Sequence, residues 1–139
     1  MPSPVERTLK ALRDAGWTVH VVEHFNPHVK VRQDFGGFAD LLAYGCGPGV
    51  VAVNCTTDDY EIAEHVRKFK GKPSKREPNP PAKKLAALAR IAENVRHWLA
   101  SGNRLLVTGW AKRGGKPRAR TGELVLVEGK ITIRASEEA

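Results

Sequence analysis

The sequence predicts an α/β fold with a mixed central sheet flanked by helices. A capped amphipathic helix opens the chain, and strand-like runs follow it. Two further amphipathic helices separate these runs from a second group of strands at the end of the chain. Such an order is typical of helices packed on a sheet. With 139 residues, the chain is long enough to bury a core, and we expect a single domain over residues 1–139.

The first helix is expected to begin at Pro4. Ser3 is a typical N-cap, proline favours the first helical position, and Glu6 completes a capping box. The apolar residues that recur at helical spacing are Val5, Leu9 and Leu12. Gly16 ends the helix, and residues 17–23 then alternate as a strand. The residues on one face of this strand are Trp17, Val19, Val21 and Glu23.

A hairpin with strands at residues 38–44 and 50–56 forms the centre of the predicted sheet. The residues between the strands include three glycines and a proline, which favour a turn. A hairpin symmetric about this turn places Asp40 opposite Asn54, with side chains about 5 Å apart. Thr56 follows on the same face, because side chains alternate along a strand. We therefore expect the functional site at this end of the hairpin.

Two helices and an intervening loop follow. The Thr57-Asp58-Asp59 run favours the start of a helix. Its expected apolar stripe is Ile62, Val66 and Phe69. Residues 71–81 contain four prolines, which exclude a helix and favour an exposed basic loop. A third helix is expected over about residues 82–101. Its expected apolar face is Leu85, Leu88, Ala92, Val95 and Leu99, with Ile91 and Trp98 beside it.

The last third of the chain is expected to form strands. Residues 104–111 are expected to form a strand, followed by a basic loop over residues 112–120. A C-terminal hairpin over residues 123–134 pairs its two strands across Glu128-Gly129.

The net charge of +8 and the isoelectric point near 9.8 favour a polyanionic partner, most often a nucleic acid. Thirteen of the 23 Lys and Arg residues lie in the two stretches 67–84 and 112–120. Flexible basic segments contact phosphates without reading base sequence. An inert basic surface is the alternative. The residues expected to bind nucleic acid are Arg32, Lys70, Lys72, Lys75, Arg76, Lys112, Arg113, Lys116, Arg118 and Arg120.

Other classes of protein are disfavoured by the composition. No apolar run approaches membrane-spanning length, and the N-terminus lacks the apolar core of a signal peptide, so we expect a cytoplasmic protein. The two cysteines form no C-x-x-C pair, which disfavours a disulfide framework or a zinc site.

Several features occur in a distinctive order: a glutamate on the first helix, a Gly-Trp step into a strand, an aspartate, and two polar residues on the next strand before a helix. The residues are Glu6, Gly16, Trp17, Asp40, Asn54 and Thr56, with Gly109-Trp110 further on. Over residues 4–111 this arrangement resembles the PD-(D/E)XK nuclease family. It is most similar to archaeal-type and phage-encoded Holliday junction resolvases. The resemblance implies a restriction-endonuclease-like α/β sandwich.

The same resemblance implies a structure-selective DNA endonuclease that uses Mg²⁺ or Mn²⁺ and acts as a homodimer on branched or duplex DNA. Asp40 falls on the family's metal-binding aspartate. Asn54 and Thr56 stand where the family has an acid and a lysine. Asn54 offers only a neutral carbonyl oxygen to a metal, and Thr56 carries no charge.

These departures leave two functions to be supplied by other residues. Glu6, Glu23 or Asp34 would complete the metal ligands around Asp40 and Asn54. Thr56, or Lys68 on the second helix, would position the water. A catalytically inactive DNA-binding module with the nuclease fold is the alternative from another class. A small adaptor whose basic segments meet an acidic partner is a third.

Overall fold

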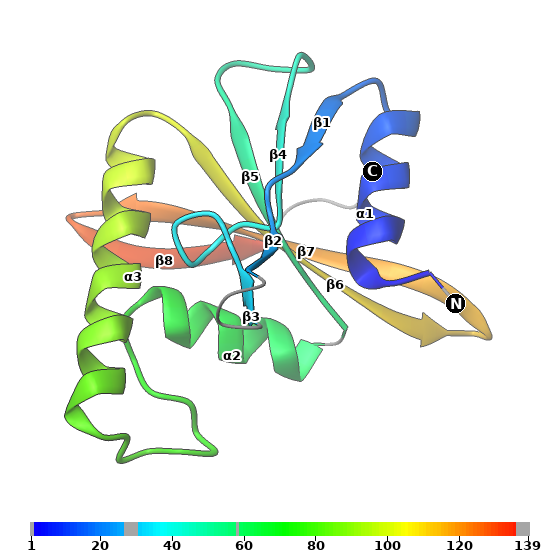
Figure 1. Cartoon of the computed structure of the whole chain (residues 1–139). Helices are drawn as coiled ribbons and strands as arrows, with labels where there is room; N and C mark the ends of the chain where they lie inside the picture. The colour runs from blue at the N-terminus through cyan, green and yellow to red at the C-terminus, as the bar shows by residue number, and fades with distance from the viewer. Residues whose placement is uncertain (1, 27–30, 58, 136–139) are drawn as a thin grey trace.

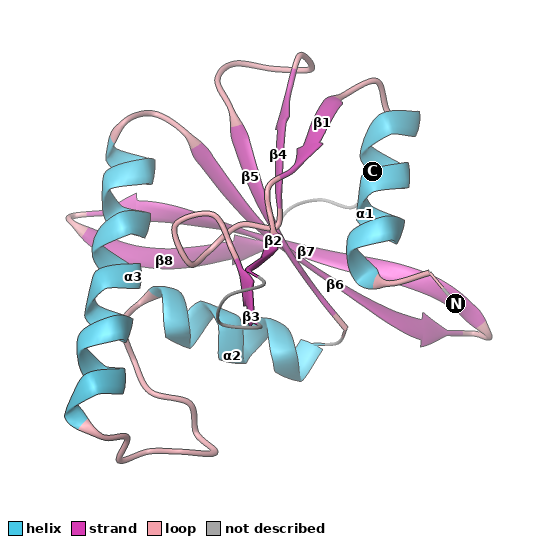
Figure 2. Ribbon diagram, viewed as in Figure 1, coloured by secondary structure: helices cyan, strands magenta, loops and turns pink. Residues whose placement is uncertain are grey.

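The computed structural model describes residues 2–26, 31–57 and 59–135. Within these ranges, only the backbone is described at residues 24–26, 31–33, 59, 60 and 135. Figures 1 and 2 show strands crossing the centre of the molecule with helices on both sides. The elements are α1 (Pro4–Asp14), β1 (Thr18–Val21), β2 (His24–Asn26), β3 (Val31–Gln33), β4 (Leu41–Tyr44), β5 (Val51–Thr56), α2 (Asp59–Phe69), α3 (Ala82–Ala100), β6 (Arg104–Arg113), β7 (Lys116–Val127) and β8 (Lys130–Ala135).

The central sheet has six strands in the order β1-β4-β5-β6-β7-β8. Neighbouring strands are antiparallel except β5 and β6, which are parallel and are connected through α2 and α3. A parallel pair needs such a crossover, because its second strand must start at the same edge as the first. The short strands β2 and β3 form a separate two-stranded antiparallel sheet. The predicted mixed sheet with flanking helices is confirmed at this level.

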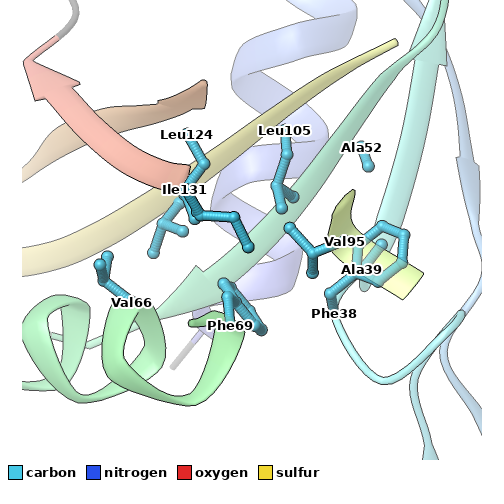
Figure 3. Packing of buried hydrophobic residues seen from close by; sticks show 10 residues of the cluster. Phe38, Ala39, Ala52, Val66, Phe69, Val95, Leu105, Leu124 and Ile131 are labelled. Carbon is cyan, nitrogen blue, oxygen red and sulfur yellow. The ribbon is translucent and has the colours of Figure 1, made fainter. Parts of the chain in front are cut away.

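Helices cover both faces of the sheet. The apolar side of α1 packs against one face; that cluster includes Leu9 and Leu12 with Val19, Leu41 and Val53. Helices α2 and α3 pack against the opposite face. Figure 3 shows the buried side chains of this second cluster at close range. The side chains of that cluster include Val66, Phe69, Val95, Leu105, Leu124 and Ile131. Complete burial of a side chain such as Phe69 contributes about 1.5–3 kcal/mol.

The three predicted helices are confirmed, with one exposed residue on the expected apolar face of α3. Ser3 caps α1, and its Oγ accepts a hydrogen bond from the Glu6 amide at 3.2 Å. The helix-start signal at Asp58 lies outside the described residues. In α3, Ala92 and Val95 are buried but Leu85 is exposed, because the first turn of this helix extends past the sheet beside the proline-rich loop. Within the described residues, no helix is both long and apolar enough to cross a membrane.

The register of the predicted hairpin is confirmed, but its first strand is shorter. Leu41 pairs with Val53 and Ala43 with Val51, so the hairpin is symmetric about Gly47 as expected. The pairing ends at Leu41 and Val53, and beyond it the Asp40 amide donates to the Val53 carbonyl at 3.0 Å. Residues 38–40 are not part of β4, because they belong to a tight turn described below.

The expected basic loop over residues 112–120 is wrong. Strand β6 continues to Arg113, and β7 begins at Lys116. Gly114 and Gly115 both have positive φ, at 62° and 78°, and make a two-residue turn that lets the strands stay paired up to it. The hairpin of β7 and β8 across Glu128-Gly129 is confirmed. Residues 71–81 contain no helix or strand, as expected.

Candidate metal centre

A tight turn brings two carboxylates together. The amide of Phe35 donates to the Ala39 carbonyl at 2.9 Å, and the Ala39 amide donates to the Phe35 carbonyl at 3.1 Å. Asp34 and Asp40 lie one residue outside this antiparallel bridge, on either side of it. Residues in this relation face each other across a β-pair. The two aspartates, six residues apart in sequence, are therefore neighbours.

Two glycines make this turn possible. Gly36 and Gly37 have φ values of 61° and 80°, in the region that disfavours side chains. A Cβ on Gly37 would lie 2.8 Å from Cγ1 of Ile91 on α3. The Asn94 side chain, also on α3, donates to the Gly36 carbonyl at 3.1 Å. The turn is thus fixed against α3 by close packing and a hydrogen bond.

Glu23 supplies a third carboxylate to the same place. The amides of Val22 and Glu23 donate to the Asp40 carbonyl at 2.9 and 3.3 Å, which holds the chain after β1 against the turn. Oxygen atoms of Glu23, Asp34 and Asp40 all lie within 4.8 Å of one another. The sequence placed Glu23 on one strand face with Val19 and Val21. In the structure β1 ends at Val21, and the backbone hydrogen bonds to Asp40 position Glu23 instead.

Asp40 is the most deeply buried of the three carboxylates, with 6% of its surface exposed. Burial is the main cause that raises the pKa of Asp40 to about 7. The nearby charges of Asp34 and Glu23 raise this pKa further, whereas a hydrogen bond from the Cys55 amide, at 2.7 Å, lowers it. The carboxylate cluster therefore holds its full negative charge poorly unless a cation joins it.

Asn54 adds a neutral oxygen that has no hydrogen-bond partner in the described part of the chain. The residue is only 1% exposed, and among the described residues none donates a hydrogen bond to its Oδ1. A buried acceptor left without a donor costs about 1–3 kcal/mol, so such atoms are uncommon unless they have a ligand. Asn54 and Asp40 line the same cleft.

The cleft measures about 590 Å³. It lies between the N-terminal turn of α1, the ends of β1 and β5, and α2. The residues that line it are Ser3, Pro4, Val5, Glu6, Leu9, Val21, Glu23, Asp34, Asp40, Asn54, Cys55 and His65. This described lining includes no lysine or arginine.

His65 is a cleft residue that the sequence reading did not select. The pKa of His65 is lowered, chiefly by burial and further by the positive charge of Lys68 one turn along α2. Its Nδ1 is buried and has no hydrogen-bond partner among the described residues. Helical spacing could have identified it, because His65 follows Ile62 by three residues and precedes Phe69 by four, at the edge of the apolar stripe.

Two predicted catalytic residues lie away from the acids. Thr56 is buried on the same face of β5 as Asn54 but is not part of the cleft lining. Lys68 lines a neighbouring hollow of about 210 Å³, separated from the acids by His65, which borders both spaces. Glu6 does line the cleft. The structure thus brings Glu6, Glu23, Asp34, Asp40 and Asn54 together and leaves Thr56 and Lys68 outside.

The predicted nucleic-acid residues divide into two regions. Near the proline-rich loop, Arg76 pairs with Glu61 at 2.7 Å. Lys70 and Lys72 line a hollow of about 390 Å³ together with two cations that the sequence reading did not select, Arg96 and Lys130. Lys75 is exposed. The cations that lie on β6 and β7 instead are Lys112, Arg113, Lys116, Arg118 and Arg120. The side chain of Arg32 lies outside the described part of the structure.

The donor set of the cleft suits a hard divalent cation. Mg²⁺ and Mn²⁺ favour oxygen ligands, and Mg²⁺ is commonly held by one or two carboxylates. Three carboxylates and an amide oxygen without a partner supply such ligands. Their mutual repulsion and burial, which raise the pKa of Asp40, are relieved when positive charge is added.

Compared with models of protein families, with curated proteins and with solved structures, the chain matches none of them. The chemistry of the site therefore rests on its own geometry.

Proposed function

We propose that this protein is a divalent-metal-dependent DNA endonuclease of the structure-selective, resolvase-like type. The observation that carries the proposal is the grouping of Glu23, Asp34 and Asp40 beside the unpartnered Asn54 Oδ1. Three carboxylates grouped in a cleft of a basic protein fit a divalent metal that contacts a phosphodiester.

The topology supports the same proposal. Helix α1 precedes three antiparallel strands in the order β1-β4-β5, and helices then lead to β6, parallel to β5. This is the order implied by the resemblance to PD-(D/E)XK nucleases. We include in the proposal the finer fold assignment, a restriction-endonuclease-like sandwich. Because fold alone does not establish function, the proposal depends on the residues of the site.

Each residue then has a definite task. Glu23, Asp34, Asp40 and the Asn54 amide oxygen would hold Mg²⁺ or Mn²⁺. When bound, such an ion activates water and neutralises charge on phosphoryl oxygens. The lowered pKa of His65 keeps its imidazole neutral near pH 7, so a ring nitrogen can accept a hydrogen bond or a proton from water.

A second candidate function is a DNA-binding module that has lost catalysis. The observation that favours it is the missing cation: Thr56 stands where the resemblance implies lysine, and no lysine or arginine is found in the described lining of the cleft. On this alternative the acids bind metal without cleaving DNA.

The decisive experiment measures DNA cleavage. The protein is incubated with a four-way DNA junction and with linear duplex, in Mg²⁺, in Mn²⁺ and in EDTA. Asp40→Asn is the test variant, because it keeps the size of the side chain and removes its charge. Asp14→Asn is the matched control, because Asp14 is an exposed aspartate paired with Lys10 on α1. We expect metal-dependent cleavage by the wild type and the control, and none by Asp40→Asn.

Two other outcomes are informative. DNA binding without cleavage, together with a metal-dependent rise in melting temperature that Asp40→Asn lacks, supports the inactive module. If neither metal changes the melting temperature of the wild type, the metal centre is wrong. Resolution of a junction requires two cuts, so the proposal includes a homodimer, which a mass measurement in solution checks.

A further inference from the structure

Strands β6 and β7 extend beyond the rest of the sheet. The pairing of β5 with β6 ends at Thr56 and Gly109, and the pairing of β8 with β7 reaches only to Gly122. Beyond these positions, residues 110–113 pair with residues 116–119, and among the described strands they pair only with each other. We call residues 110–119 the ribbon. Figure 2 shows it projecting past α1.

The two faces of the ribbon are chemically different. Directly paired residues share a face, and successive residues alternate between faces. Trp110 and Lys112 therefore share one face with Pro117 and Ala119. The opposite face carries Arg113, Lys116 and Arg118, and Arg120 continues it at the base of the ribbon. Thus four of the five cations over residues 112–120 lie on one face.

Contacts with α1 identify which face is which. The indole nitrogen of Trp110 donates to the Thr8 hydroxyl on α1 at 2.9 Å, so the face with Trp110 and Lys112 is the α1 side of the sheet. The four-cation face is therefore on the side that α2 and α3 cover. Leu105 and Val107 of β6 are in the core under those helices and share this face with Gly109 and Arg113.

The four-cation face is continuous with the face that carries Asn54. Along β5, Asn54 and Thr56 share a side of the sheet with Ala52, which lies in the core beneath α2 and α3. Thr56 pairs with Gly109 across β5 and β6, and Gly109 pairs with Arg120 across β6 and β7. A line of paired residues thus runs from Thr56 on β5, across Gly109 on β6, to Arg120 at the base of the ribbon.

The ribbon has no negative charge of its own. Residues 110–122 contain no Asp or Glu, and Lys116 and Arg118 are exposed at its far end. The Arg113 guanidinium donates to the Arg118 carbonyl at 3.3 Å, which keeps two of the cations on one surface. The exposed side chains of Lys116 and Arg118 can contact a polyanion from solvent.

We propose that the face formed by Arg113, Lys116, Arg118 and Arg120 binds the phosphate backbone of duplex DNA, and that the Lys112 face does not. The choice of duplex DNA rests on the proposed function. A two-stranded ribbon is narrow enough for the major groove, about 12 Å wide, and cations on one face position such a ribbon without reading bases. This face of the ribbon lies on the same side of the sheet as Asn54.

A matched pair of lysines tests the proposal. Lys112→Ala and Lys116→Ala each remove one charge from an exposed lysine of the same ribbon, but from opposite faces. Binding of the wild type and each variant to a 30-bp duplex is measured in EDTA by fluorescence anisotropy, over a range of KCl concentrations. We expect Lys116→Ala to weaken binding about three- to tenfold and to reduce the slope of log affinity against log salt by about 0.9.

Arg118→Ala should act like Lys116→Ala, and the double variant should lose about twice as much of the salt slope. Lys112→Ala should bind as the wild type does. Melting temperatures of the variants establish that each is folded. Equal losses from Lys112→Ala and Lys116→Ala, or no loss from either, would overturn the proposal.

This test is separate from that of the enzyme. If DNA is not cleaved but binding shows the one-faced pattern, the ribbon proposal stands and the nuclease proposal fails. If DNA is cleaved in a metal-dependent manner while Lys116→Ala and Arg118→Ala bind as the wild type does, the ribbon proposal alone fails.

Discussion

Two acidic residues, Asp40 beside the central sheet and Glu123 within it, have equal solvent exposure and opposite surroundings. Asp40 and Glu123 are each 6% exposed. Glu123 accepts hydrogen bonds from Arg104 at 2.9 and 3.1 Å and from Arg134 at 3.4 Å. These bonds, chiefly those from Arg104, lower the pKa of Glu123. Asp40 has two further acids beside it, and its pKa is raised to about 7.

The difference separates a structural charge from a candidate functional one. A buried carboxylate is stable when arginines accompany it, and this chain provides them for Glu123. The same chain, with a net charge of +8, supplies no lysine or arginine to the described lining of the cleft. Grouped acids of this kind are destabilising in the folded state and are characteristic of sites that bind a cation.

The largest effect is expected from Gly37→Ala, which breaks the turn that groups the acids. A left-handed residue with a side chain costs about 1–2 kcal/mol, and the contact of its Cβ with Ile91 costs about 1–3 kcal/mol more. We expect the free energy of unfolding, measured with urea, to fall by about 2–5 kcal/mol.

Gly114→Ala is the control for this change. Gly114 also has a positive φ, 62°, but a Cβ there would meet no atom within 4 Å. Its loss should be about 1–2 kcal/mol, from the backbone conformation alone. Equal losses for the two variants would contradict the close packing of the Asp34–Asp40 turn against α3.

Asp40→Asn is expected to stabilise the protein when no metal is present. The pKa of Asp40 is about 7 in the folded state and about 3.9 in an unfolded chain, so the folded state binds more protons between these values. Wild-type stability therefore falls as the pH rises from about 4 to about 7, because burial penalises the charged form. At pH 8 we expect a gain of about 2–3 kcal/mol in the free energy of unfolding of the variant.

Urea denaturation in EDTA at pH 5 and pH 8 measures this gain. The difference between variant and wild type should grow from the lower pH to the higher one. Added Mn²⁺ should stabilise the wild type and not the variant. A variant that is less stable than the wild type at pH 8 would show that Asp40 is a structural acid like Glu123.

Glu123→Gln should have the opposite sign. The pKa of Glu123 is lowered in the fold, so its charge stabilises the protein above the unfolded pKa, and this contribution is lost as the pH falls through the folded pKa. Arg104 and Arg134 are 39% and 67% exposed, so water and salt screen the ion pairs. We expect a loss of about 1–2 kcal/mol at pH 7 and a smaller one near pH 3, both measured by urea denaturation.

Local patterns were enough to predict part of the site. A glycine-rich turn of known centre fixes which residues of its two strands pair, so the register that brings Asp40 and Asn54 to one cleft followed from sequence. Ser3, Pro4 and the apolar spacing likewise predicted α1. These features depend on residues that are close together in the sequence, so local patterns are enough to predict them.

Features that depend on contacts between distant segments were not predicted. The Lys-, Gly- and Pro-containing stretch at residues 112–120 has the composition of a loop, but its strands pair because β6 and β7 are already aligned further back. Glu23 reaches the acids because the Asp40 carbonyl accepts from the backbone after β1. The arginines beside Glu123 come from β6 and β8, which no local pattern connects.

The smallest effect concerns how much of the Asp40 shift comes from its acidic neighbours. Burial is the first cause of the raised pKa, and the charge of Asp34 is a lesser one. Asp34→Asn removes that charge and keeps an amide that can still donate to Asp40, so the pKa of Asp40 should fall by about one unit or less. A ¹³C NMR titration of the Asp40 carboxyl carbon measures the change, with Asp14→Asn as the control. If the pKa of Asp40 fell to the ordinary value near 3.9, repulsion rather than burial would be the main cause. The contrast with Glu123 would then lie chiefly in the neighbouring charges, because Glu123 has two arginines beside it where Asp40 has two acids.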